Sequence, residues 1–427
     1  MRGYFTIATI LACTLSHAGM QEHNTVKLNT FTYEQSLQQA ASPVYTKNQT
    51  SGMLSEATRY EKLAKTTDWP VLPSGPLLSF GDSHPHIPIL RKQLQLLGDY
   101  PVESNCDSSD LFDVDLHDAL IHFQQRHGRK VDGILGRNSR RLLNISPQQR
   151  AATLKLNVYR ISQFESPQPP YIRVNIPEYN LRFVQGEQPT LTMKTIVGKR
   201  KRKTPIFTTE INRVVVNPSW HVPKSIAYKD ILPAWQDDPD YLKKLNLKVV
   251  SGWGKQQQQI PDAGVNPDSL YQGDNYQRFW EPPSDKNTLG KVKFLTTGPY
   301  AIYLHDTSAK RLFLQEKRSF SSGCIRLEQP RKLADALLAY SNRLTEGDVS
   351  PIFNRSETET IQLAKPVRLF TTYWTAWQDS NGTLHFRDDV YRRDKQDLIT
   401  LNTDIQKNIL NREQMIAEID RPVETDQ

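Results

Sequence analysis

The sequence predicts an α+β multidomain protein, in which a mainly antiparallel β domain with a lid-like insertion is joined to a small three-helix domain and a helical scaffold. Three observations support this fold class. A chain of 427 residues is too long for one ordinary core, so two to four domains are expected. Apolar residues at helical spacing dominate the first third. Short β-branched and aromatic runs, separated by Gly, Pro and Asn, dominate the middle.

The composition is that of folded domains with a basic surface. Hydrophobic residues make up 37% of the chain, and no apolar run approaches the roughly 18 residues that a membrane span needs. The net charge of +8 favours an anionic surface or polymer as partner. The densest basic cluster, GKRKRKT at residues 198–204, is flanked by strand-like runs, so we expect a solvated hairpin tip. No nucleic-acid module surrounds it, and no nucleic-acid partner is expected.

The N-terminus has the outline of an export signal. One Arg precedes an apolar stretch from Tyr4 to Leu15, and Ser16-His17-Ala18 offers small residues for cleavage. We therefore expect residues 1–18 to be removed. Lipoprotein processing at Cys13 is a competing interpretation, although the apolar stretch before it would be short.

After loss of the signal, two cysteines remain, Cys106 and Cys324. Export to an oxidising compartment favours paired cysteines. These two lie more than two hundred residues apart, so a disulfide between them is not required by the sequence. A lone thiol in an exported enzyme is a candidate for function, which directs attention to Cys324.

The helical first third divides into a scaffold and a compact domain. Residues 28–82 and 146–168 have moderate helical patterns and are expected to form the scaffold. Residues 83–145 contain two sharper patterns, IPILRKQLQLLGDY with Gly98 as the expected C-terminal cap, and DLHDALIHFQQRHG ending at Gly128. VDGILGRNSRRLLN then predicts a turn and a third short helix.

The stretch from Leu90 to Leu143 resembles the peptidoglycan-binding domain family. FQQRHGRKVDGILGRNSRRLL is its most specific part, with Asp132-Gly133 and Gly136 at the turn before the last helix. The resemblance implies binding to cell-wall polymer or stem peptide. A three-helix packing domain with a degenerate groove is the alternative.

Several histidines near this domain raise the question of zinc. They lack the paired spacing, with Cys or carboxylate partners, of a known metal site, so we expect no metal and no cofactor. The five are His84, His86, His117, His122 and His127.

Residues 169–356 contain the β-rich runs and are expected to form the catalytic domain. Residues 222–283 interrupt these runs with a partly helical segment that carries Trp235, Trp253 and Trp280. Such an insertion is either a lid over a site or a segment packed on the sheet. Residues 357–427 are expected to form a C-terminal hairpin, over 367–391 around Asn381-Gly382, and a tail.

The segment FSSGCIRL, residues 320–327, is the candidate for chemistry. Cys324 lies before a predicted helix that starts near Pro330, and a nearby base with backbone N–H groups lowers a thiol pKa at such a place. His305, nineteen residues earlier at a strand end, would act as that base. Ser322 and Gly323 would let backbone N–H groups, with that of Cys324, form an oxyanion hole. By spacing alone, a purely structural cysteine is equally well supported.

The ordered motifs of this region resemble the L,D-transpeptidases of the YkuD type. His305-Asp306-Thr307 and Ser322-Gly323-Cys324-Ile325-Arg326 match the active-site signature, over a similarity that covers about residues 170–350. Together with the wall-binding module and the insertion, the chain is most similar to the large periplasmic YcbB-like branch. Supporting segments are VGKRKRKTPIF (197–207), NPSWHVP (217–223) and NTLGKVKF (287–294).

The resemblance implies a two-step acyl transfer at the third residue of a tetrapeptide stem, through a Cys324 thioester, giving 3-3 cross-links and free D-alanine. Tyr303 and Trp220 would line the pocket, and Arg326 would hold a substrate carboxylate or the loop. Either Asp306 or a backbone carbonyl would orient His305.

Two other functions stay open, namely an L,D-carboxypeptidase that hydrolyses the same thioester and a non-catalytic wall-binding scaffold. The expected partners are peptidoglycan stem peptides, with association with other cell-wall synthesis proteins left open. We expect a periplasmic monomer, and covalent reaction of a carbapenem with Cys324.

Overall fold

The computed structural model describes residues 47–100, 108–164, 167–186, 188–261, 265, 270–272, 276–298 and 302–403. The predicted signal, Cys13, Cys106, the start of the scaffold and the end of the tail lie outside these residues. The described chain forms two compact units, one of residues 63–147 and one of residues 47–62 with 148–403. No helix within these ranges is both long and apolar enough to cross a membrane.

The first unit contains the three helices that the sequence predicts, α3 (Ile87–Leu97), α4 (Val114–Arg126) and α5 (Arg137–Leu143). Gly98 ends α3 with φ of 80°, a left-handed conformation that glycine adopts without steric cost. The side chain of Asp113 caps α4 by accepting a hydrogen bond from the Leu116 N–H. The predicted helix ends are therefore confirmed by local backbone geometry.

Histidines of this unit make structural contacts. His122 Nδ1 lies 2.7 Å from Asp99 Oδ1, and His127 Nδ1 lies 2.8 Å from the Phe123 carbonyl one helical turn earlier. Asp99 also pairs with Arg126, which holds the pKa of its buried carboxyl below the usual range despite the cost of burial. These contacts join α4 to the end of α3.

Two helices of the predicted scaffold are α2 (Lys47–Thr66) and α6 (Pro147–Ser162). Lys155 of α6 forms an ion pair with Glu61 of α2. The buried Asn157 of α6 bonds both the backbone N–H and the hydroxyl of Thr375. Helix α6 is thus attached to the C-terminal part of the second unit.

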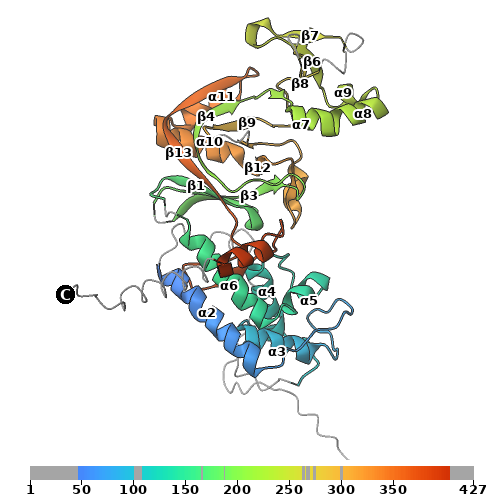
Figure 1. Ribbon diagram of the computed structural model, residues 1–427, viewed down its shortest axis with the longest axis vertical. Coiled ribbons are helices and arrows are strands. Elements are labelled where there is room, and N and C mark those ends of the chain that lie inside the picture. The colour runs from blue at the N-terminus through green and yellow to red at the C-terminus, as the bar shows by residue number, and fades with distance from the viewer. Residues whose placement is uncertain are drawn as a thin grey trace, which may run out of the picture. The chain divides into compact units, whose positions relative to one another are not determined.

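The centre of the second unit is a nine-stranded sheet in the order β11-β3-β12-β10-β9-β4-β13-β1-β2 (Figure 1). Strand β3 also pairs with β2, so the pairings run in a closed ring. Six of the nine pairings are antiparallel, which confirms the mainly antiparallel prediction. The strands are β1 (Tyr171–Asn175), β2 (Asn180–Val184), β3 (Pro189–Gly198), β4 (Thr208–Val216), β9 (Val292–Thr296), β10 (Leu304–His305), β11 (Ser319–Ser321), β12 (Ile325–Leu327) and β13 (Glu359–Thr372).

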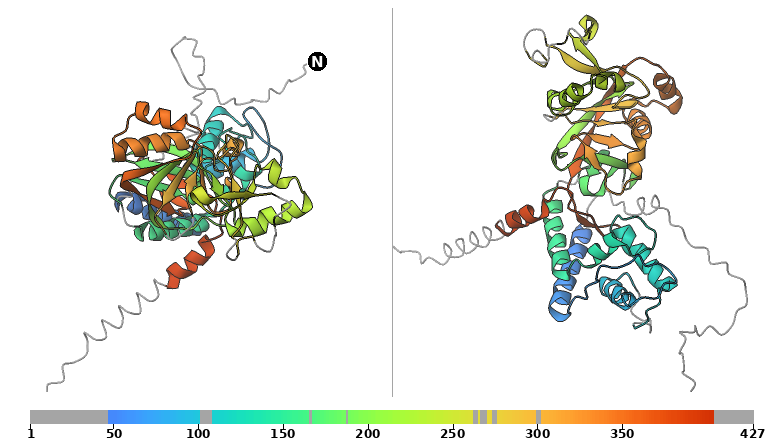
Figure 2. Two further views of the ribbon diagram at one scale, coloured as in Figure 1. Left: turned by 90° about the horizontal axis from the view of Figure 1, so that it is seen from above. Right: turned by 90° about the vertical axis from the view of Figure 1, so that its right-hand side faces the viewer.

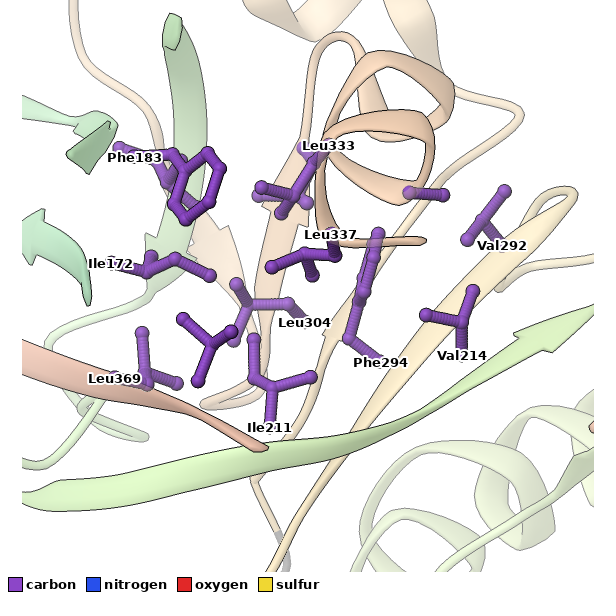
Figure 3. Close-up of a cluster of buried hydrophobic side chains, with 14 of the residues drawn as sticks. Ile172, Phe183, Ile211, Val214, Val292, Phe294, Leu304, Leu333, Leu337 and Leu369 are labelled. Atoms are coloured by element: carbon purple, nitrogen blue, oxygen red, sulfur yellow. The ribbon is translucent and has the colours of Figure 1, made fainter. Parts of the chain in front are cut away.

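The predicted helix after the cysteine segment is α10 (Pro330–Asn342), with Pro330 at its start where a missing N–H costs nothing. Its Leu333 and Leu337 are fully buried and face the side chains of the sheet (Figure 3). Phe294 of β9 and Leu304 of β10 lie in the same cluster. The core therefore fixes the strands that carry the candidate catalytic residues. Helix α11 (Glu346–Phe353) follows, and its Val349 joins this core.

The insertion forms a subdomain with a sheet of its own in the order β5-β8-β6-β7. In both views of Figure 2 it lies on the other side of the sheet from α10 and α11. Its core contains Leu232, Val249 and Phe279, and also reaches Trp220 and Leu289, so it packs on the catalytic domain. Movement as a lid stays a prediction. Its elements are β5 (Trp220–His221), α7 (Lys224–Ile226), η2 (Ala227–Ile231), α8 (Leu232–Asp237), α9 (Tyr241–Lys244), β6 (Lys248–Ser251), η3 (Gly254–Gln256), β7 (Gln258–Ile260) and β8 (Arg278–Glu281).

One prediction about strand connections is wrong, and the bounds of another differ from those in the structure. Strands β3 and β4 do not pair with each other, so residues 198–204 are a connection between distant strands and not a hairpin tip. The hairpin around Asn381-Gly382 is confirmed as β14 (Ala376–Gln378) with β15 (Leu384–Phe386), but it is shorter than predicted. Residues 359–372 belong to β13, between β4 and β1, so the catalytic sheet extends past residue 356.

We expect Leu337→Ala to lower the free energy of unfolding by about 3 kcal/mol, because it removes a fully buried side chain and leaves a cavity. Leu314→Ala is the control, since Leu314 is 83% exposed and its loss should change stability by less than about 0.5 kcal/mol. Urea denaturation followed by fluorescence measures both. Equal stability of the two variants would contradict the placement of α10 over the sheet.

Candidate active site

A pocket of about 470 Å³ lies between the catalytic domain and its insertion. Six of the predicted site residues line this pocket: Cys324, His305, Tyr303, Trp220, Arg326 and Ser322. Gly323 and Asp306, which are next to lining residues in the sequence, do not line it. The full lining is Arg202, Lys203, Pro205, Trp220, Pro223, Ser225, Ile226, Thr288, Leu289, Ile302, Tyr303, His305, Ser321, Ser322, Cys324 and Arg326.

Strands β10 and β12 bring the cysteine and the histidine together. They pair in parallel, with Leu304 opposite Ile325 and His305 opposite Arg326. Leu304 and Ile325 point into the core, and successive side chains along a strand alternate between faces. His305 and Arg326 therefore face the pocket, together with Tyr303 and Cys324.

The turn before Cys324 is held by the hydroxyl of Ser321. It accepts a hydrogen bond from the Gly323 N–H at 3.1 Å and donates to the Cys324 carbonyl. Gly323 has φ of 124°, which a residue with a Cβ adopts only with strain. This removes the Gly323 N–H from the predicted oxyanion hole, because Ser321 Oγ already accepts its hydrogen bond. The part assigned to the Cys324 N–H stays a prediction.

Thr204 supports the same turn from the β3–β4 connection. Its hydroxyl donates to the Gly323 carbonyl at 2.7 Å and accepts from the Gly198 N–H. Its own N–H donates to the Tyr391 hydroxyl, which in turn donates to the Gly198 carbonyl. Three distant segments of the chain thus meet behind Cys324.

Arg202 links the insertion to the cysteine turn. Its guanidinium makes a bidentate pair with Asp230 of η2 and also donates to the Ser322 hydroxyl at 3.0 Å. The pairing with Asp230 raises the pKa of Arg202. Arg202 lines the pocket, so its ion pair with Asp230 attaches η2 of the insertion to the wall of that pocket.

The thiol and the imidazole are both neutral in the resting site. Burial raises the pKa of the Cys324 thiol, although contacts with Tyr303 and the charges of Lys293 and Arg326 act in the opposite direction. Burial, together with the charges of Arg326 and Lys293, lowers the pKa of His305 to about 3. A neutral imidazole is the form that can accept a proton.

Tyr303 connects the pocket wall to the sulfur. Its hydroxyl accepts a hydrogen bond from Trp220 and contacts Cys324, and burial raises its pKa, so it stays protonated. Lys293 of β9 lies with Nζ 3.9 Å from the centre of the Tyr303 ring, a cation–π distance. It is also paired with His305 in the β9–β10 register. The sequence contained no signal that distinguished Lys293, since Lys at a strand position is usually solvated.

Asp306 does not orient His305 through its carboxylate. That carboxylate accepts from the Lys291 and Thr307 N–H groups and pairs with Lys310. The backbone of Asp306 is the contact that raises the pKa of His305, as a backbone carbonyl would. His305 Nδ1 is buried without a well-formed hydrogen bond among the described residues.

Arg326 offers a cation within the pocket. It is half-buried, and its Nε has no hydrogen-bond partner in the described part of the chain. Burial lowers its pKa, which the negative charge of a cysteine thiolate or a bound carboxylate would oppose. Within the described ranges, His, Cys, Asp and Glu form no group of three or more that could hold a metal.

Comparison with protein families gives two matches. Residues 169–355 match the YkuD family, described as "L,D-transpeptidase catalytic domain". Residues 83–143 match a family described as "Putative peptidoglycan binding domain".

A Haemophilus influenzae protein described as "Putative L,D-transpeptidase" is 32% identical over 240 residues, which cover 56% of this chain and 48% of that relative. The match thus spans about half the length of the relative. Solved L,D-transpeptidases from Stackebrandtia nassauensis and Xylanimonas cellulosilytica are 12% and 10% identical, with TM-scores of 0.25 and 0.18. They cover 71% and 70% of this chain and 98% of each solved chain. These TM-scores are too low to place any residue.

Replacement of Lys293 by Met should slow alkylation of Cys324 by iodoacetamide several-fold at pH 8, because a positive charge that favours the thiolate is lost. The rate should rise with pH in every variant, since the thiol pKa is raised and only the thiolate reacts. Lys293→Arg should retain the rate. Lys291→Met is the matched control, as Lys291 pairs with Asp285 outside the pocket. Peptide masses report the modification, and an unchanged rate in Lys293→Met would exclude this role.

Proposed function

We propose that the protein makes 3-3 cross-links in peptidoglycan through a thioester at Cys324, because residues 169–355 match the L,D-transpeptidase catalytic domain family. The supporting observation is that Cys324 and a neutral His305 line the same pocket. The match of the first unit to a peptidoglycan-binding family supports the same polymer as substrate.

In the first step, His305 takes the thiol proton and the sulfur attacks the carbonyl carbon of the third stem residue. The carbonyl π electrons move to oxygen, and Tyr303, which stays protonated, is placed to donate to that oxyanion. When the oxyanion collapses, the C–N bond to the terminal D-alanine breaks. The imidazolium returns its proton to the leaving amine, so free D-alanine and a thioester result.

In the second step, the side-chain amine of a diamino acid on another stem attacks the thioester carbonyl. His305 accepts the amine proton and returns it to the departing sulfur, which restores the thiol. Lys293 and Arg326 favour the thiolate in both steps, since each lowers the pKa of Cys324. Arg326 also has the charge to bind a stem carboxylate.

We place this reaction in the periplasm, on the basis of the export signal that residues 1–18 resemble. Lipidation at Cys13 would tether the same enzyme to a membrane. An L,D-carboxypeptidase would use the same Cys324 and His305 with water in place of the amine, and a wall-binding scaffold would use neither.

Incubation of the purified protein with tetrapeptide-bearing muropeptides should give dimers linked between third residues, with release of D-alanine. Mass spectrometry of the products distinguishes three outcomes. Dimers support the proposal, tripeptides indicate the carboxypeptidase, and unchanged tetrapeptides indicate the scaffold. Cys324→Ser should abolish product formation.

A carbapenem should add covalently to Cys324, by opening of its lactam ring and formation of a thioester. His305→Gln should slow the addition by about 10²–10⁴-fold, the usual contribution of a general base. Because the pKa of His305 is lowered to about 3, the imidazole stays neutral above that pH. As the pH is lowered, acylation should therefore fall only as the thiolate population falls, without an additional inflection near pH 6.5, the range of an ordinary histidine. A separate inflection there would contradict the buried, cation-flanked environment of His305. Intact mass measures the adduct.

A further inference from the structure

Four aromatic rings of the insertion form a continuous track, which we name the aromatic track: Trp253, Tyr276, Tyr271 and Tyr228. The ring centres are 6.3 Å apart from Trp253 to Tyr276, 5.8 Å from Tyr276 to Tyr271, and 6.2 Å from Tyr271 to Tyr228. Trp253 and Tyr276 are nearly parallel, with an interplanar angle of 26°. These residues come from three regions of the sequence, around residue 228, around residue 253 and at 271–276, so the fold assembles the track.

Three of the four rings are open to solvent. Trp253 is 59% exposed, Tyr276 37% and Tyr228 36%, whereas Tyr271 is buried beneath them. Large aromatic side chains favour burial, and neighbouring exposed rings indicate a binding surface. None of these rings contributes to the pocket lining around Cys324.

The exposed rings are held in fixed positions. The guanidinium of the buried Arg278 lies 3.4 Å from the centre of the Trp253 ring and covers one of its faces. Arg278 is itself held by hydrogen bonds to His221 and Gln257. Trp253 is still 59% exposed, although Arg278 covers one face and the rings of His221 and Tyr276 lie 5.3 and 6.3 Å from its centre. A fixed ring loses little conformational entropy when it binds a ligand.

The other end of the track reaches the rim of the pocket. Tyr228 lies in η2, two residues after Ile226, which lines the pocket together with Ser225. Two residues further on, Asp230 forms the ion pair with Arg202. The Tyr228 hydroxyl is anchored to the Leu270 carbonyl at 2.7 Å. The track therefore runs from the entrance of the active site outward over the insertion.

The chemistry of the track fits a sugar polymer. Pyranose rings have flat C–H faces that stack on aromatic rings, and hydroxyl and amide groups around their edges that need hydrogen bonds. Tyrosine and tryptophan combine an apolar face with a polar edge. Two amides lie beside the track: the exposed Gln272 donates to the Tyr228 hydroxyl, and the half-buried Gln257 accepts from Arg278. A closed apolar groove, as a lipid chain would need, is not formed by these rings.

We propose that the aromatic track binds the glycan strand of the polymer whose stem peptide enters the pocket, stacking on its amino-sugar rings. This inference rests on the proposed function for the identity of the polymer. Binding energy from the aromatic track, far from the reacting carbonyl, would then raise turnover of a stem peptide carried on a glycan strand, and would not affect a free stem peptide.

The test compares two donors, a tetrapeptide carried on glycan strands and the same tetrapeptide free. Trp253→Ala should lower kcat/KM on the glycan-borne donor by about tenfold, a typical effect of losing one aromatic contact. Its effect on the free tetrapeptide should be much smaller, because the pocket is intact. Trp253→Phe should recover part of the loss. Leu314→Ala, which removes an 83% exposed apolar side chain elsewhere in the unit, is the control.

Equal losses on both donors would assign Trp253 a structural role and overturn the proposal, as would no loss on either. If the wild-type protein turns over neither donor, the proposed function fails but the track can still be tested. Peptide-free glycan strands are then the probe, and co-sedimentation should show weaker binding for Trp253→Ala than for the wild type and Leu314→Ala. Equal binding by all three would overturn the track independently of catalysis.

Discussion

The parallel register between β10 and β12 is the constraint on which the site depends. Leu304 and Ile325 are opposite each other and fully buried, so the residues beside them on each strand must face away from the core. A shift of one residue would bury His305 and Arg326 among leucines and expose the core. The hydrophobic core around α10 therefore determines where His305 and Arg326 point, although none of its members lines the pocket.

Burial also sets the protonation state of this pair. The same low-dielectric surroundings that raise the pKa of Cys324 and lower that of His305 strengthen every charge that faces the sulfur. The charges of Lys293 and Arg326 therefore stabilise a thiolate at Cys324 more than they would in water. In the proposed reaction, Lys293 and Arg326 would stabilise a negative charge that forms on the sulfur only during the reaction, and no thiolate would be needed beforehand.

Local patterns predicted much of the fold and of the site. Helical spacing and Gly98 predict the helices of the first unit. The choice of Cys324 and His305 rests on the resemblance of their motifs to the YkuD signature, since spacing alone supports a structural cysteine equally well. The structure brings both residues to one pocket. The pairing of strands that are distant in the sequence was not predictable. The sequence suggested a hairpin at residues 198–204, whereas β3 and β4 have other partners. Lys293 and Ser321 acquire their positions only from contacts across the sheet and turn, so one sequence has no signal for them.

Tyr391 has a consequence for where this catalytic domain ends. Its hydroxyl joins Thr204 to Gly198, and Thr204 in turn holds the Gly323 carbonyl next to the nucleophile. Strand β13 supplies a further partner for both β1 and β4. A fragment cut where the family similarity stops, at residue 355, would lack a middle strand of its sheet and the phenol that braces the cysteine turn. A fragment that keeps the complete sheet and the support of the cysteine turn must therefore be longer than the region of family similarity. It must extend past the β14–β15 hairpin to include Tyr391.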